Sequence, residues 1–116
     1  MKLSDSRINK TFVLNIVGDV DHHSTEEIKR YIYNNIGMMS KHLIINLSEV
    51  NFMDSSGIGM ILGRYKEMVE KNGSVSIVGI KGNMERIYKL SGLYKIIKNY
   101  NTLEEGIIDI EGGTNE

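Results

Sequence analysis

The stretch with the most chemical potential is FMDSSGIGMILGRYK, which spans residues 52–66. An apolar run leads into it and an amphipathic run leaves it, with one aspartate, two serines and closely spaced glycines between them. Hydroxyl and carboxylate groups beside glycines suit four uses. They can form a serine nucleophile, a phosphate-binding turn or a helix cap, or they can present a serine that is itself modified.

A dinucleotide site is disfavoured by the residues on both sides of the glycines. Gly57, Gly59 and Gly63 spell G-x-G-x-x-x-G between a strand pattern and a helix pattern, a variant of the phosphate-binding fingerprint. That fingerprint needs an acidic residue about 20 positions further on to hold the ribose. The corresponding segment is SIVGIKG, which contains no acid, and MDSS stands where an open glycine turn is required.

A serine nucleophile is also disfavoured. A nucleophile elbow has glycine two residues before the serine, whereas Met53 precedes Ser55 and Asp54 precedes Ser56 at that spacing. His22 or His23 could approach along the same edge of the fold, but no oxyanion motif accompanies them.

A metal site is not predicted either. His22, His23 and His42 are the only imidazoles, and the chain has no cysteine. Adjacent histidines in an extended turn point in roughly opposite directions, so the pair does not converge on one ion.

Helix capping explains part of the motif, because Asp and Ser are the usual residues where a strand passes into a helix. Capping needs one such side chain rather than three, and each glycine costs roughly 1 kcal/mol of helix propensity. Glycines at the exposed end of a helix lower its stability, but they leave the backbone uncovered. We therefore expect another surface to approach the backbone of this helix.

A modified serine remains. The amides and dipole of a helix N-terminus favour an anion, so the fold would tolerate a phosphoryl group on Ser55 or Ser56. The group would add about −1.5 to −2 charges beside Asp19, Asp21 and Asp54. The pattern therefore favours a phosphorylation-controlled binding surface, with pure capping kept as the structural alternative.

Composition limits the class of protein. At 116 residues and 41% apolar content the chain is expected to form one domain with a modest core. A net charge of −1 with both signs mixed argues against a nucleic-acid binder. The chain has no long apolar window and no signal-peptide pattern, so we expect a soluble, cytoplasmic protein without stable membrane association. We also expect a monomer rather than an oligomer.

Periodicity predicts the order β-β-α-β-α-β-α-β-α for the supporting elements. The expected strands are 2–8, 11–17, 41–52, 74–80 and 94–100. The expected helices are 25–39, 55–71, 82–92 and 101–110, with the domain ending at 110 and a flexible tail over 111–116. This is an α/β fold with a mostly parallel sheet of four or five strands and an antiparallel N-terminal edge.

Helix faces and caps can be assigned at the same level. On the first helix the inward residues are expected to be Ile28, Tyr31, Ile32, Asn35, Ile36 and Met39, and Ser24 with Glu27 forms a predicted capping box. On the second helix the inward residues are expected to be Ile58, Ile61, Leu62, Tyr65, Met68 and Val69. Asn72-Gly73 is expected to end this helix. Asn101 or Thr102 should cap the last helix.

Two turns occupy equivalent positions in this order of elements. DVDHHS and MDSSG each follow a strand and precede a helix. If their strands are parallel, both turns open at the same edge of the sheet, where α/β folds place their sites.

Three segments together carry a family resemblance: GDVDHHSTEEIK, LIINLSEVNFMDSSGIGMILGRYK and KLSGLYKIIK. In this order and spacing the chain resembles the STAS-domain anti-sigma factor antagonists, most closely the sporulation members that act on the anti-sigma F factor. The resemblance covers about residues 5–110. It implies the STAS fold and a regulator that is not an enzyme and needs no cofactor.

The resemblance also implies a mechanism. The unphosphorylated protein would bind an anti-sigma factor that is an ATP- or ADP-bound serine kinase, and so release sigma factor F. Phosphorylation by that kinase on Ser55, the first serine of DSSG, would break the complex, and a serine phosphatase would restore it. The general stress-response pathway is an alternative, and so is a STAS-domain sensor of a nucleotide or small ligand.

The same resemblance implies roles for single residues. Ser55 is the phosphoacceptor; Asp54 orients the loop or meets the kinase; Ser56 caps the helix or adds a polar contact. Asp21 matches a position on the docking edge. The further partner-contact candidates are Gly57, Gly59, Met60, Gly63 and Arg64.

Overall fold

The computed structural model describes residues 1–114. Its single sheet has the strand order β1-β2-β3-β4-β5, with β1 antiparallel to β2 and every other neighbouring pair parallel. The strands are β1 (Lys2–Ile8), β2 (Thr11–Val20), β3 (His42–Met53), β4 (Ser74–Val78) and β5 (Asn99–Tyr100). The predicted mixed sheet with an antiparallel N-terminal edge is confirmed.

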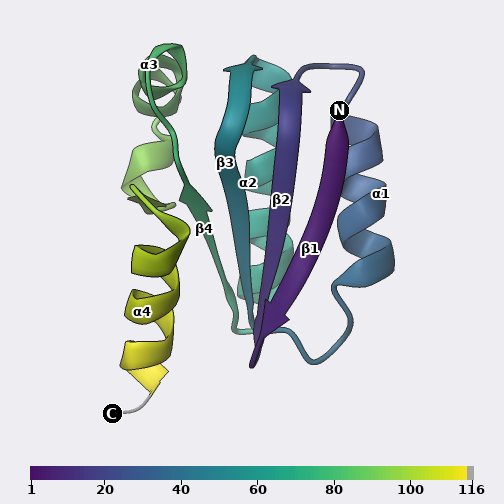
Figure 1. The fold of residues 1–116 in the computed structure, drawn as a ribbon, viewed down its shortest axis with the longest axis vertical. Helices are drawn as coiled ribbons and strands as arrows, with labels where there is room; N and C mark the ends of the chain where they lie inside the picture. The colour runs from purple at the N-terminus through teal and green to yellow at the C-terminus, as the bar shows by residue number, and fades with distance from the viewer. Residues whose placement is uncertain (115–116) are drawn as a thin grey trace.

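Within residues 1–114, three α-helices lie between strands and a fourth follows β5, in the predicted order (Figure 1). They are α1 (Thr25–Asn35), α2 (Ser55–Glu70), α3 (Asn83–Leu90) and α4 (Leu103–Thr114), with a short 3₁₀ helix, η1, at Leu93–Lys95. The tail expected from residue 111 begins as helix, since α4 continues to Thr114, and residues 115–116 lie outside the described part of the chain.

The core lies mainly on the sheet face covered by α1, α2 and α3. Phe12, Leu14, Ile16, Leu43 and Ile45 point from β2 and β3 into this cluster, as expected for branched and aromatic residues on paired strands. Figure 1 shows α1 and α2 side by side behind the sheet. The opposite face has a smaller cluster, in which α4 packs against the strands. Its members are Val13, Ile44, Val78 and Tyr100, with Leu103, Ile107 and Ile110 packed on them.

Three of the predicted strand limits differ by two or more residues from the structure. The strand predicted over 74–80 ends at Val78, since Gly79 adopts a positive φ of +83°. β2 continues past Gly18 to Val20, because its pairing with β3 shifts register twice and Gly18, at φ +123°, accommodates the irregular backbone. The last predicted strand, 94–100, pairs only at Asn99–Tyr100. Its first part is the 3₁₀ turn that brings Leu93 and Ile97 into the core.

The predicted helix faces need three corrections. Ile28, Ile32 and Ile36 are buried, but Asn35 is exposed because α1 ends there. Met39 lies beyond that end and is 73% exposed. Arg7 of β1 caps α1 by donating to the Asn35 and Ile36 carbonyl oxygens. On α2, Val69 is 47% exposed although Ile61 and Met68 are buried.

The second helix stops where Asn72-Gly73 predicted. Asn72 adopts the left-handed conformation at φ +62°, and the Gly73 amide donates to the Met68 carbonyl at 2.7 Å. A Cβ on Gly73 would stand 2.2 Å from the Lys41 carbonyl oxygen, so only glycine fits.

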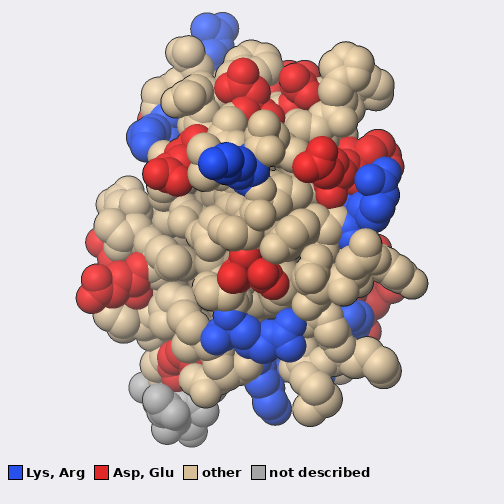
Figure 2. Space-filling model, turned by 45° about the vertical axis from the view of Figure 1, so that its right-hand side comes forward, with Lys and Arg blue, Asp and Glu red and all other residues tan. Residues whose placement is uncertain are grey.

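Charged side chains of both signs are interspersed on the face shown in Figure 2, as the net charge of −1 suggests. No helix within residues 1–114 has the length and apolar character needed to cross a bilayer.

Candidate functional site

The carboxyl ends of β2 and β3 bring the two suspected turns to one edge of the sheet. Val20 pairs with Met53 in the parallel register, and the Asp54 amide donates to the Val20 carbonyl at 3.1 Å. The loop that begins at Asp21 and the loop at Asp54 are therefore neighbours, as predicted. We call residues 21–24 and 54–56 the site edge.

Ser55 is the first residue of α2, and its side chain is exposed. Asp54 precedes it in an extended conformation, and the first helical turn closes with the Gly57 amide donating to the Asp54 carbonyl at 3.0 Å. An anion attached to Ser55 would stand at the positive end of a 16-residue helix.

Asp54 is the cap of this helix, and the prediction that Ser56 caps it was wrong. The Asp54 carboxylate accepts a hydrogen bond from the Ser56 amide at 2.8 Å. The cap is formed by the residue that leaves β3 in the extended conformation, because only that residue can direct its side chain back at the first free amides. Ser56 contributes its backbone, and its side chain is partly buried.

Asp21 closes the neighbouring loop in a similar way. Its Oδ1 accepts from the amides of His23 and Ser24 at 3.0 Å each, and the Asp21 amide donates to the Ser24 hydroxyl at 2.9 Å. The bond from the Ser24 amide is the main reason why the pKa of the Asp21 carboxyl lies below its usual value. The Asp21 carboxylate is thus hydrogen-bonded within its own loop, which neighbours the loop of the candidate serine.

This arrangement replaces the predicted capping box of Ser24 and Glu27. Ser24 has helical backbone angles and makes no capping bond to α1. The reciprocal pair is shifted three residues toward the N-terminus, onto Asp21 and Ser24. The spacing Asp-x-x-Ser was visible in the sequence, and it is the signal that could have identified Ser24 as a loop residue.

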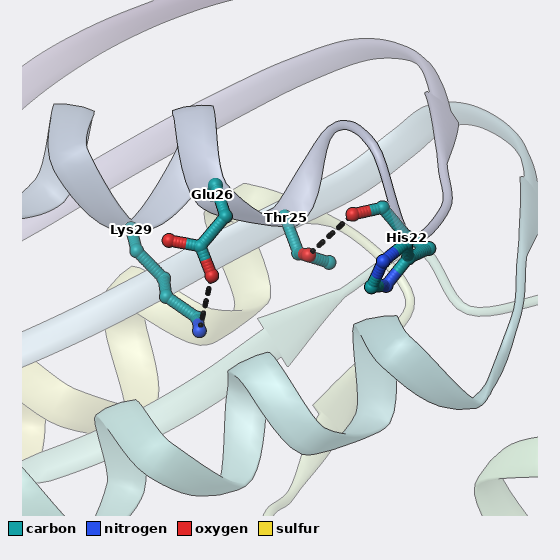
Figure 3. Close-up of polar contacts among 4 residues, drawn as sticks. All are labelled: His22, Thr25, Glu26 and Lys29. Carbon is teal, nitrogen blue, oxygen red and sulfur yellow. Dashed lines mark hydrogen bonds and ion pairs between the residues drawn. The ribbon is translucent and has the colours of Figure 1, made fainter.

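The histidines of the same loop do not form a site with each other. Their rings meet edge to face with 5.8 Å between centroids, and the His22 carbonyl accepts from the Thr25 hydroxyl at 3.2 Å (Figure 3). This hydrogen bond holds the end of the loop at the start of α1. The sequence did not indicate this role for Thr25. Within residues 1–114 no group of three or more His, Asp and Glu side chains is arranged to hold a metal ion.

The glycines of α2 fall into two kinds. Gly57 is buried, and a Cβ there would stand 2.4 Å from Met53 Cγ and 3.0 Å from Val20 Cγ1. Gly59 and Gly63 have no neighbouring atom within 4 Å of such a Cβ. Gly57 is therefore required by packing inside the protein, whereas Gly59 and Gly63 leave parts of the outer helix surface without side chains.

Burial removes two of the partner-contact candidates. Met60 is 2% exposed and packs in the main core, and Gly57 is buried beneath Met53. Both were named as partner-contact candidates from the family resemblance, and their burial argues against that role. Neither residue presents a side chain to a partner in this structure, so we do not retain them.

Arg64 lies at the middle of α2, with 14% of its side chain exposed. Its Nε donates to Glu67 Oε1 at 2.6 Å, while its Nη1 is buried and has no hydrogen-bond partner among residues 1–114. Of the sequence-predicted contacts, the exposed or partly exposed set is Asp21, Asp54, Ser55, Ser56, Gly59, Gly63 and Arg64.

The family comparison and the sequence relatives of this chain agree with each other. The STAS domain family matches residues 3–106. The anti-sigma F factor antagonist of Paenibacillus polymyxa is 30% identical over 100 residues, covering 85% of this chain and 86% of that protein. The anti-sigma-B factor antagonist of Bacillus subtilis is 27% identical over 94 residues, covering 81% and 85%.

Solved structures agree with the sequence relatives. The anti-sigma factor antagonist SpoIIAA in its unphosphorylated form matches with a TM-score of 0.84 and 27% identity over 96% of this chain and 97% of that one. The Bacillus SpoIIAA in the phosphorylated form matches with a TM-score of 0.75 and 29% identity over 94% and 99%. This chain belongs to the STAS domain family, and it has the fold of SpoIIAA.

Proposed function

We propose that this protein is an anti-sigma factor antagonist that is switched by phosphorylation of Ser55 and has no catalytic activity of its own. The observation that carries the proposal is the exposed Ser55 hydroxyl at the first position of α2, directly after the capping Asp54. In support, relatives that cover most of the chain are anti-sigma factor antagonists, and a similar solved protein exists in phosphorylated and unphosphorylated forms.

In the proposed cycle the unphosphorylated form binds the ATP- or ADP-bound anti-sigma factor kinase, which then releases the sporulation sigma factor F. The kinase later transfers the γ-phosphoryl group of ATP to Ser55 Oγ. The new P–O ester bond forms as the bond to ADP breaks, and a base on the kinase takes the serine proton. A serine phosphatase hydrolyses the ester and returns the protein to its binding form, in the cytoplasm.

The switch follows from charge placed on an otherwise unchanged fold. The phosphoryl group adds about −1.5 to −2 charges next to Asp54 and close to the loop of Asp21. The helix N-terminus offsets this charge within the protein, but a partner surface that fitted the neutral serine meets both repulsion and bulk. Each 1.4 kcal/mol of that penalty weakens binding tenfold.

Intact mass spectrometry after incubation with the cognate anti-sigma kinase and ATP tests the assignment. Wild type and the control variant Ser56→Ala are expected to gain one phosphoryl group, and Ser55→Ala none. A phosphorylated Ser55→Ala protein would refute Ser55 as the acceptor.

The sporulation pathway is preferred over general stress response because the anti-sigma F antagonist is the more similar relative, at 30% against 27% identity. Binding assays with purified anti-sigma F and anti-sigma B factors decide between them. Equilibrium dialysis of the isolated protein with ATP and GTP tests the alternative sensor role, which micromolar retention of either nucleotide would favour.

A further inference from the structure

The segment 81–98 concentrates positive charge. It holds five basic side chains and one acidic side chain, a formal charge of +4 in a chain whose total is −1. It forms α3 and η1 and includes KLSGLYKIIK at 89–98, a stretch to which the proposed function assigns no role. Figure 1 shows α3 on the side of the molecule opposite to α1.

The cations at the two ends of this segment are held by the fold. Lys81 Nζ donates to the Ser48 carbonyl at 2.8 Å, and Lys98 Nζ pairs with Asp109 Oδ2 at 3.2 Å. The three cations between them are exposed and form no ion pair within residues 1–114; they are Arg86, Lys89 and Lys95. Their charge is therefore available to an anionic surface outside the protein.

On α3 two of these cations share a face with an exposed apolar side chain. Arg86, Lys89 and Leu90 stand at positions i, i+3 and i+4, which lie on the same side of a helix. The opposite side of α3 is anchored in the core by Met84 and Tyr88. Leu90 is 75% exposed, so a large apolar group lies uncovered beside the two charges.

The turn after α3 repeats this combination. Gly92, at φ +79°, directs the chain from α3 into η1. Tyr94 is 50% exposed and Ile96 is 47% exposed, and Lys95 Nζ lies 5.9 Å from the centroid of the Tyr94 ring. We call the six residues of this surface the basic–apolar patch: Arg86, Lys89, Leu90, Tyr94, Lys95 and Ile96.

The order of residue types in the patch favours a membrane over a protein as the partner. Protein interfaces are depleted of lysine, and their apolar centres exclude charge. Here lysine stands directly beside each apolar side chain, in KL at 89–90 and in YKI at 94–96. At a bilayer surface this order is favourable. A lysine can extend its ammonium group to the lipid phosphates while its alkyl stem and a tyrosine ring lie at the headgroup level.

We infer that the basic–apolar patch binds reversibly to the surface of a bilayer that contains anionic lipid. The three cations contact the lipid phosphates, and Leu90, Tyr94 and Ile96 enter the headgroup region. Each cation near such a surface strengthens binding about fivefold, so three together favour an anionic over a neutral bilayer on the order of a hundredfold. The inference does not depend on Ser55 or on the proposed function.

Vesicle flotation of the full-length protein tests the inference, with phosphatidylcholine vesicles that contain or lack phosphatidylglycerol. Wild type is expected to float with the anionic vesicles alone, and to be released at about 1 M NaCl, where the Debye length falls to about 3 Å. The double variant Lys89→Gln/Lys95→Gln should bind at least about tenfold more weakly, and Leu90→Ser roughly tenfold more weakly.

Matched controls remove the same kinds of side chain elsewhere on the surface. Lys66→Gln removes an exposed cation of α2, and Met38→Ser removes an apolar side chain that is 92% exposed. Both should float like wild type. Because the patch side chains are exposed, the patch variants should keep the wild-type melting temperature, which calorimetry on the same preparations measures.

Three outcomes would overturn the inference. The first is no flotation of wild type with anionic vesicles, and the second is flotation of the patch variants equal to that of the controls. The third is capture of wild type by immobilised poly-glutamate without vesicle binding, which would assign the patch to an acidic protein. None of these outcomes affects the assignment of Ser55 as the phosphoacceptor.

Discussion

The Asp54 carboxylate accepts a hydrogen bond from the Ser56 amide at 2.8 Å, and Ser55 stands between the two with its side chain exposed. The capping function and the proposed modification thus fall on adjacent but different residues. Because Asp54 caps the start of α2, the Ser55 hydroxyl is not needed for the cap.

We expect Asp54→Ala to lower the free energy of unfolding by about 1 kcal/mol, the usual cost of a lost N-cap. Asp54→Asn retains a capping oxygen, so it should stay within a few tenths of a kcal/mol of wild type. Urea denaturation of the three proteins provides the measurement. Equal losses in both variants would show that the charge of Asp54, rather than its hydrogen bond, stabilises the helix.

Ser55→Asp should keep the wild-type melting temperature but bind the anti-sigma factor at least tenfold more weakly. A negative charge in the first turn is favourable for the helix, whereas it is unfavourable for a partner that fits a neutral serine. Differential scanning calorimetry and a binding titration measure the two effects. Binding of Ser55→Asp with wild-type affinity contradicts the charge-switch mechanism.

Much of this fold could be predicted because each element carries its own local signal. The change of period from two to 3.6 located the four α-helices and five strands of residues 1–114 in order, and the parallel register placed Asp21 and Asp54 at one edge. Ser55 at the helix start followed from the Asp-Ser-Ser-Gly junction alone.

The features that could not be predicted from the sequence depend on tertiary contacts. The segment 94–100 contains aromatic and branched residues typical of a strand, yet burial of Ile97 and the short reach of β4 leave only Asn99–Tyr100 paired. Met60 was named as a partner-contact candidate from the family resemblance, which carries no information on burial, and the structure places it in the core at 2% exposure. The contact between Gly57 and Met53 likewise becomes visible only in the folded structure.

Substitution of the α2 glycines should separate packing from docking. Gly57→Ala brings a methyl group to within 2.4 Å of Met53 Cγ, in a side chain that is 5% exposed, and should cost about 1–3 kcal/mol as overpacking does. Gly59→Ala and Gly63→Ala meet open space, so each should stabilise the protein by roughly 0.5–1 kcal/mol through helix propensity.

The stabilised glycine variants also test the docking surface. If a partner approaches the helix backbone, Gly59→Ala should bind the anti-sigma factor more weakly than wild type despite its greater stability. Chemical denaturation and a binding titration on the same preparations give both quantities. Unchanged affinity in Gly59→Ala and Gly63→Ala would show that these glycines do not serve the interface.

The pH dependence of stability should report the Asp21 loop. The pKa of Asp21 is lowered in the folded protein, chiefly by the Ser24 amide, from an ordinary value of 3.8. A carboxyl with a depressed pKa stabilises the fold above its unfolded value, and this contribution is lost as the pH falls through the folded value. Wild type should therefore exceed Asp21→Asn in stability at pH 7, and the difference should shrink below about pH 4. Urea midpoints of both proteins between pH 7 and pH 3 test this, and a difference that grows on acidification contradicts the assigned role of the carboxylate.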